Sequence, residues 1–295
     1  MDKLPNAKSK YSSKYSSIYS TEQFGLFRIL LGTHLFVFFA RLLTESAELF
    51  SGESIFFNAT SASSPIWNPF LVYGHPDVSQ VALCFALLLS ALFTLGIVRK
   101  SAAILIWILL IFMADRLRPY TPTFLSYLGW MLIASVFVPK GEAFSVVKKR
   151  NESWLFPESI FYLGWIVAAV GYTISAIYKL DTESWVSGNA LVYAANSMLG
   201  NDNVFAHGFL VLPPLMQKLI TWLTLMAEFI VFLFLWNPYS RAVIWWILTF
   251  MQILLFLLID IEEITITVLI FHFFLMSPRL FSKLKAKQKP IASEA

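Results

Sequence analysis

The chain has 295 residues, of which 58% are hydrophobic and only 14% are charged. Soluble domains carry about 25% charged residues, so this composition excludes an ordinary soluble domain and predicts a membrane protein. The net charge of +4 would suggest a nucleic-acid partner for a soluble protein, but basic residues in a membrane protein follow its topology, so no nucleic acid is expected. Cys84 is the only cysteine, which excludes a disulfide within the chain and a cysteine pair for a metal.

Eight apolar segments predict an all-α, polytopic helix bundle, because a helix of about 20 residues spans a bilayer. In chain order they cover residues 24–43, 78–98, 102–114, 124–138, 160–178, 220–236, 243–259 and 264–276. The third, fourth and eighth are short for a full span, so we expect them to be tilted, extended by flanking residues or buried in the bundle. The last two have an alternative interpretation as one broken helix pair, because Asp260, Glu262 and Glu263 interrupt an almost continuous apolar run.

Basic residues set the predicted orientation, because they accumulate in cytoplasmic segments. Most of the 22 lysines and arginines lie before the first segment or after the second, fourth, sixth and eighth, and acidic residues occupy the alternate loops. Eight spans with both termini cytoplasmic satisfy this pattern, whereas seven would break it. The predicted organisation is a polar tail at 1–19, a transmembrane domain at 20–280 and a basic tail at 281–295.

Targeting signals and loops complete this outline. Nothing at the start of the chain resembles a cleavable signal peptide, and no eukaryotic sorting signal is visible, so a bacterial inner membrane is the expected location.

Two outer loops, 44–77 and 180–219, are long, and loops above about 15 residues are often functional. Their aromatic residues predict that they lie on the bundle or in the membrane interface. The spacing from Ser20 to Gln23 matches a capping box that begins the first helix.

Four polar side chains fall inside the predicted spans, where charges are costly and usually face the bundle interior. Arg28 lies about one turn from the cytoplasmic end of the first span, so it is expected either to reach the surface or to support a site. Glu228 lies deeper in the sixth span and should be protonated or paired with an arginine or a lysine. His34 and His272 are expected to hydrogen-bond neighbouring helices. None of the four has metal-ligand spacing with another, so no metal site is predicted.

Lys179 closes the fifth span on its outer side and is the leading candidate for chemistry. Tyr172, Ser175 and Lys179 lie at i, i+3 and i+7, which places them on one helical face. Tyr178 is adjacent. The resulting polar stripe is expected to face the protein interior, as a binding wall or as a set of interhelical hydrogen bonds.

Three roles are open for the Lys179 amine. It can extend to the headgroups, as lysines at helix ends usually do. It can pair with an acidic residue, for which Glu228, Asp181 and Glu183 are the candidates. It can also act as a base if partial burial removes its charge.

Residues 171–191, GYTISAIYKLDTESWVSGNAL, resemble the signature of the HTTM family, the membrane domains similar to vitamin K-dependent gamma-carboxylase. The pattern is an aromatic helix end with Lys-Leu, followed by a turn that contains Trp185 and Gly188. The start FGLFRILLG, which contains Arg28, resembles the opening of the family, and the likeness covers about residues 20 to 280. It implies that Lys179 is the base that starts the chemistry of a reduced quinone.

The sequence departs from the carboxylase at one important position. The carboxylase carries an Asn-His pair at the start of the fourth span, where this chain has Thr123 and Phe124. It also continues into a large luminal domain that grips peptides. Protein carboxylation by this chain alone is therefore not expected. A short bacterial branch of the family, which assists maturation of a secreted peptide toxin, is closer in architecture.

Three functions follow as hypotheses. The first is a quinone-linked membrane enzyme or peptide-maturation factor with Lys179 as base. The second is a non-catalytic membrane component, such as a chaperone, an immunity protein or a subunit of a peptide-processing or export system, in which the outer loops matter more than Lys179. The third and weakest is a transporter, because neither half-helix pairs nor an inverted repeat support it. The expected partners are the lipid bilayer and a secreted peptide or a membrane protein.

Overall fold

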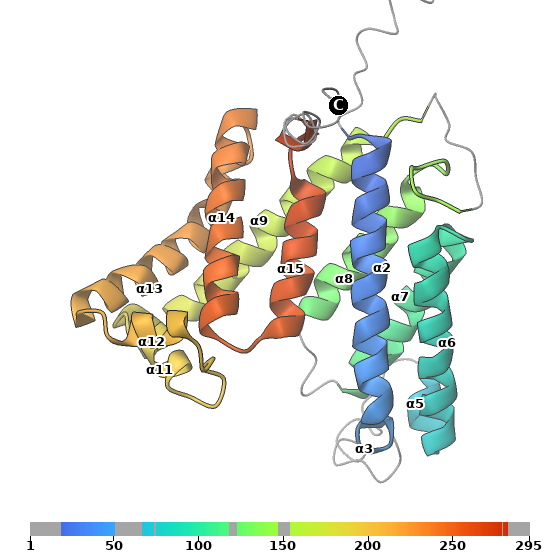
Figure 1. Ribbon diagram of the computed structural model, residues 1–295, viewed down its shortest axis with the longest axis horizontal. Coiled ribbons are helices and arrows are strands. Elements are labelled where there is room, and N and C mark those ends of the chain that lie inside the picture. The colour runs from blue at the N-terminus through green and yellow to red at the C-terminus, as the bar shows by residue number, and fades with distance from the viewer. Residues whose placement is uncertain are drawn as a thin grey trace, which may run out of the picture.

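The computed structural model describes residues 19–50, 67–73, 75–117, 123–146, 154–278 and 280–282. These residues form helices, and their one β-type pairing is an isolated bridge between Gly200 and Ile259 (Figure 1). The predicted tails therefore lie outside the described residues, apart from Tyr19, Phe281 and Ser282. The same holds for 51–66, about half of the first long outer loop.

Every predicted apolar segment is helical. The long helices are α2 (Thr21–Thr44), α6 (Pro76–Leu95), α7 (Arg99–Arg116), α8 (Phe124–Phe137), α9 (Glu158–Leu180), α13 (Pro214–Phe229) with its 3₁₀ extension η2 (Ile230–Phe234), α14 (Pro238–Leu258) and α15 (Glu262–Leu275). The short helices are α3 (Ser46–Phe50), α5 (Pro69–Val72), α10 (Glu183–Val186), α11 (Ala190–Ala195) and α12 (Val204–Leu210).

Five of the long helices are long and apolar enough to cross a membrane, and they identify the chain as an integral membrane protein. They are α2, α6, α9, α13 with η2, and α14. The helices α8 and α15 have 14 residues each, which is short for a span. The helix α7 has 18 residues because it extends the predicted segment 102–114 to Arg99 at its start and to Arg116 at its end.

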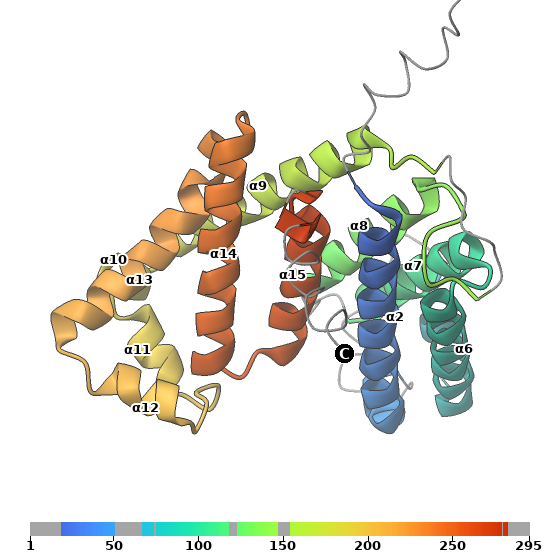
Figure 2. The same cartoon turned by 45° about the horizontal axis from the view of Figure 1, so that its top comes forward.

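The long helices pack as two groups joined by α15. One group contains α2, α6, α7 and α8, and the other contains α9, α13 and α14. The helix α15 contacts α2 and α8 on one side and α9 and α14 on the other. In both views α9 crosses behind α15 from one group to the other (Figures 1 and 2). The helices α14 and α15 are separate and run in opposite directions, so the broken-pair interpretation is wrong.

Half of the predicted capping box is present at the start of α2. The Ser20 side chain accepts a hydrogen bond from the backbone N–H of Gln23 at 3.0 Å. The Gln23 side chain does not return to residue 20 but donates to the carbonyl of Met276 at 2.9 Å. This bond joins the first turn of α2 to the end of α15, so both ends of the described bundle lie at one end of the molecule, which we call the inner end.

The second long outer loop is folded against the opposite, outer end. Its helices α10, α11 and α12 contact α9, α13 and α14. The Asn203 side chain donates to the carbonyl of Leu257 at 2.7 Å, and the backbone N–H of Asn201 donates to the carbonyl of Leu258 at 3.1 Å. These bonds use carbonyls that the end of α14 leaves free. The expectation that this loop lies on the bundle is confirmed.

Candidate functional site

Lys179 pairs with Glu228 at the outer end of the bundle. The Nζ atom lies 2.6 Å from each carboxylate oxygen, which joins the last turn of α9 to α13. The lysine side chain is 22% exposed and the glutamate side chain 4%. Of the three acidic candidates, Glu228 is the partner, because neither Asp181 nor Glu183 forms an ion pair with Lys179. An ion pair desolvated to this degree costs free energy that its Coulombic attraction only partly returns, which makes it a candidate for function.

The rest of the predicted stripe lies on the same side of α9. The Ser175 hydroxyl donates to the carboxylate of Glu228 at 3.1 Å, so the acid accepts bonds from two positions of the stripe. Tyr172 is buried one turn further in, whereas Ile166 and Val170 are exposed. The stripe therefore faces the protein interior, as expected. Tyr178 points away from it, with 71% of its surface exposed.

The motif residues after Lys179 shape the outer side of the pair. The Trp185 ring lies 4.5 Å from Nζ, in cation–π geometry. Gly188 has a φ of 80°, which allows the turn between α10 and α11, and a Cβ there would meet the stem of Lys218. Asp181 caps the end of α9 and Glu183 begins α10; both are exposed. The structure thus places the Trp185 ring beside the lysine amine, whereas Asp181 and Glu183 form no ion pair with it.

A second polar cluster lies deeper in the bundle, around Tyr172 and His272. The Gln252 amide donates to the Tyr172 hydroxyl at 3.1 Å, and that hydroxyl lies 2.8 Å from Nε2 of His272. On the other side of the ring, Nδ1 lies 3.1 Å from the Thr249 hydroxyl, and the tautomer of the imidazole sets which group donates in each of its two contacts. The expectation that His272 bonds neighbouring helices is confirmed. His34 does the same, with Nε2 lying 2.8 Å from the Thr267 hydroxyl on α15.

Tyr127 of α8 lies between these two polar groups. A Cβ at Gly171 would collide with its hydroxyl, so the glycine makes room for it beside the stripe. Sequence reasoning missed Tyr127, Thr249 and Gln252. Each is a polar residue within an apolar segment. This pattern is common at contacts between membrane helices, so it does not single out a site.

Arg28 belongs to a separate charged cluster at the inner end. The alternative in which it reaches the surface is wrong, because its side chain is fully buried and lies 3.5 Å from the carboxylate of Glu142. The same carboxylate lies 2.9 Å from Nε of Arg99. Arg28 therefore lies at the opposite end from Lys179 and does not support that site. Glu142 and the burial of Arg99 were missed, since both positions read as loop in the sequence.

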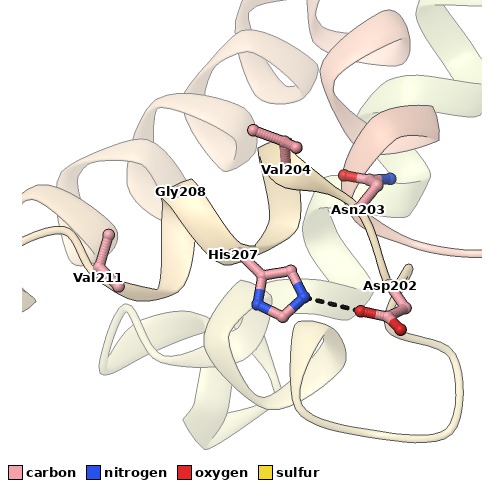
Figure 3. A pocket seen from close by; sticks show the side chains of 6 residues that line it. All are labelled: Asp202, Asn203, Val204, His207, Gly208 and Val211. Carbon is pink, nitrogen blue, oxygen red and sulfur yellow. Dashed lines mark hydrogen bonds and ion pairs between the residues drawn. The ribbon is translucent and has the colours of Figure 1, made fainter.

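Two surface hollows lie at the outer end. One, of about 540 Å³, is lined by α12 and the residues before it: Asp202, Asn203, Val204, His207, Gly208 and Val211 (Figure 3). The other, of about 770 Å³, lies beside the end of α2, where Arg41 pairs with Glu262 and Glu263. Neither hollow is lined by Lys179 or Glu228. Within the described ranges, no three histidine, cysteine, aspartate or glutamate side chains are grouped as ligands for a metal ion.

Comparisons with known proteins add no relationship. No protein-family model, no curated protein and no solved structure matches the chain.

Proposed function

We propose that the chain is a multi-pass protein of a bacterial inner membrane, with eight spans and both termini in the cytoplasm. Successive long helices run in alternate directions between the inner and outer ends (Figure 1). The inner end carries Arg99, Lys100, Lys140 and Arg241, as cytoplasmic segments do. Reporter fusions at Lys140 and Asn201 test the topology, because they should report opposite sides of the membrane. Reports from the same side would overturn it.

The Lys179–Glu228 pair is proposed as the acid–base centre for a lipid-soluble ligand. The observation that carries this is a nearly buried carboxylate within one apolar helix, α13, held 2.6 Å from an amine in the last turn of another, α9. Ionisable groups at membrane depth are expensive and are kept mainly where they bind ligands or move protons. The HTTM resemblance indicates a reduced quinone as the ligand class and Lys179 as the base.

The geometry of the pair determines which group takes the first proton. In the closed pair both carboxylate oxygens of Glu228 lie 2.6 Å from the Lys179 amine, so the amine can reach a ligand proton only after the carboxylate turns away. In the closed pair, Glu228 is the group that accepts a proton from a ligand hydroxyl, and the ammonium stabilises the developing negative charge. Ser175, which bonds the same carboxylate, orients it.

The residues around the pair fit a reduced quinone. The amine, the carboxylate and the Ser175 hydroxyl would hold its polar ring substituents, and both helices that carry them present exposed apolar side chains such as Ile174 and Met226. When bound, such a ligand would supply electrons for a reaction with oxygen. The contribution of the chain is to bind the hydroxyl, to orient it and to accept its proton.

The test uses protein purified in lipid nanodiscs. Bound lipids are extracted to identify a quinone, and epoxide formation is then measured with reduced quinone and oxygen. The wild type should form epoxide, whereas Lys179→Ala and Glu228→Gln should lose at least tenfold in rate. Lys218→Ala is the matched control, because Lys218 is a lysine of α13 that forms no ion pair with a described residue. Absence of both bound quinone and turnover in the wild type would overturn the proposal.

A second candidate is a non-catalytic membrane component of a peptide-processing or export system. It is favoured by the contact of Trp185 with Lys179, which closes the ion pair from the outer side and ties it to α10. If this function is correct, substitutions on α11 and α12 should impair peptide maturation more than Lys179→Met does. The reverse order of effects would contradict it.

A further inference from the structure

The outer helices α11 and α12 present apolar side chains that no described residue covers. On α12, Val204 is 84% exposed, and Val211, directly after the helix, is 83% exposed. Tyr193, Met198 and Phe205 are exposed on the same segment. Apolar side chains gathered in this way usually mark a surface that contacts a membrane or another protein.

The hollow on α12 combines this apolar surface with a polar edge. Val204, Gly208 and Val211 lie at i, i+4 and i+7, on one face of the helix, and a Cβ at Gly208 would meet nothing within 4 Å. At the edge, Nε2 of His207 lies 2.7 Å from the carboxylate of Asp202 (Figure 3). The hollow is therefore apolar along the helix and polar at one side, as the boundary between acyl chains and headgroups is.

The depth of α12 matches that boundary. In Figure 1 α11 and α12 do not project beyond the outer ends of α2 and α6. Pro213 and Pro214 lead directly from α12 into α13, one of the membrane-spanning helices. The exposed side chains Leu215 and Leu219 of that helix continue the apolar surface. The surface of α12 is thus continuous with the lipid-facing surface of the bundle.

We infer that the hollow on α12 holds a phospholipid of the outer leaflet. Val204 and Val211 contact the upper part of its acyl chains across Gly208, while Asp202 and His207 face the headgroup. Helices at the interface bury their apolar face at the boundary between headgroups and chains. The assignment to the outer leaflet rests on the proposed topology, and the inference does not depend on the chemistry of Lys179.

The experiment measures the depth of single fluorophores. In a Cys84→Ala background, Val204→Cys and Val211→Cys are labelled with an environment-sensitive fluorophore after reconstitution into phosphatidylcholine vesicles. Quenching is compared between lipids brominated near the glycerol end of the chain and aqueous iodide. Leu223→Cys, on the exposed face of α13, is the control for deep lipid contact, and Lys140→Cys, in the exposed inner loop, is the control for water.

The inference predicts that the shallow bromines quench both α12 positions at least twofold more strongly than they quench Lys140→Cys. Iodide should quench both positions less than it quenches Lys140→Cys. Strong quenching by iodide without quenching by bromine would show that the hollow opens to water and would overturn the inference. Protection from both quenchers would also overturn it, because a protein would then cover this surface.

Discussion

The two buried charge clusters of this molecule differ in how completely their charges are satisfied. At the inner end, Arg28, Arg99 and Glu142 are each at most 3% exposed. Arg28 donates to the carbonyls of Phe93, Thr94 and Phe144, and Arg99 donates to those of Ser135, Val138 and Pro139. At the outer end, Lys179 has one acidic partner, one aromatic ring and 22% exposure.

This difference separates a structural cluster from a site that can exchange a partner. The inner guanidinium groups fasten the ends of α6 and α8 to α2 and α7, because their fork geometry bonds several carbonyls at once. Exchange there would break many bonds together. The outer amine can leave its carboxylate at the cost of one ion pair, and a ligand hydroxyl can take its place. Burial of charge is therefore common to both clusters, and the number of fixed partners distinguishes them.

The largest expected effect tests the inner cluster. Replacing Arg99 with methionine should cost about 3–5 kcal/mol of stability, because it leaves a buried carboxylate with a weaker partner and three carbonyls without their donor. Unfolding in detergent titrations of the purified protein measures this change. Lys100→Met is the matched control, since the neighbouring lysine bonds none of these carbonyls. If Arg99→Met does not accumulate, Glu142→Gln gives the same test, and a loss below that of Lys100→Met would contradict the structural role.

The outer pair should give a smaller change that a second substitution reverses. Lys179→Met alone should cost about 1–3 kcal/mol, because Glu228 loses its ion-pair partner but keeps the hydrogen bond from Ser175. Lys179→Met together with Glu228→Leu should cost less than the single change, since an apolar pair replaces an ion pair at little expense. A double-mutant cycle in the same titration measures the coupling. Additive losses would show that the two side chains do not interact.

The contact between Gly171 and Tyr127 gives a test of packing between the two polar groups. Gly171→Ala should cost about 1–3 kcal/mol, because the new methyl group overlaps the tyrosine hydroxyl. Adding Tyr127→Phe removes that oxygen and should recover part of the loss. Val170→Ala, at an exposed position of α9, is the control. If Gly171→Ala costs the same stability in the Tyr127→Phe background as in the wild type, the tyrosine hydroxyl does not limit the space beside residue 171.

The smallest expected effect concerns the ring beside the lysine. Trp185→Leu should cost about 0.5–1 kcal/mol, the range of a cation–π contact at an exposed or partly exposed position. The loss should disappear when Lys179 is already methionine. Trp236→Leu, at an exposed tryptophan without such a contact, is the control. An unchanged loss in the Lys179→Met background would assign the effect of Trp185 to packing alone.

The sequence alone determined the class of the protein and the location of its long helices. Hydrophobic runs give each long helix directly, since a segment of that length and polarity is helical in a bilayer whatever surrounds it. Local signals also gave the Ser20 cap and the polar face of α9 with Tyr172, Ser175 and Lys179. The errors occurred at helix ends: α7 begins at Arg99 rather than three residues later, and it ends at Arg116 rather than at residue 114. The separation of α14 and α15 agrees with two of the eight predicted segments.

Only the tertiary structure decided which polar side chains meet. Lys179 and Glu228 are 49 residues apart, and Tyr172 and His272 are 100 apart, so no local pattern joins them. Their contact depends on how each helix is rotated about its axis, and many weak packing contacts set this rotation together. The burial of Arg28 follows for the same reason. Its position near a helix end was visible in the sequence, but the carbonyls that surround it come from α6 and from the segment after α8.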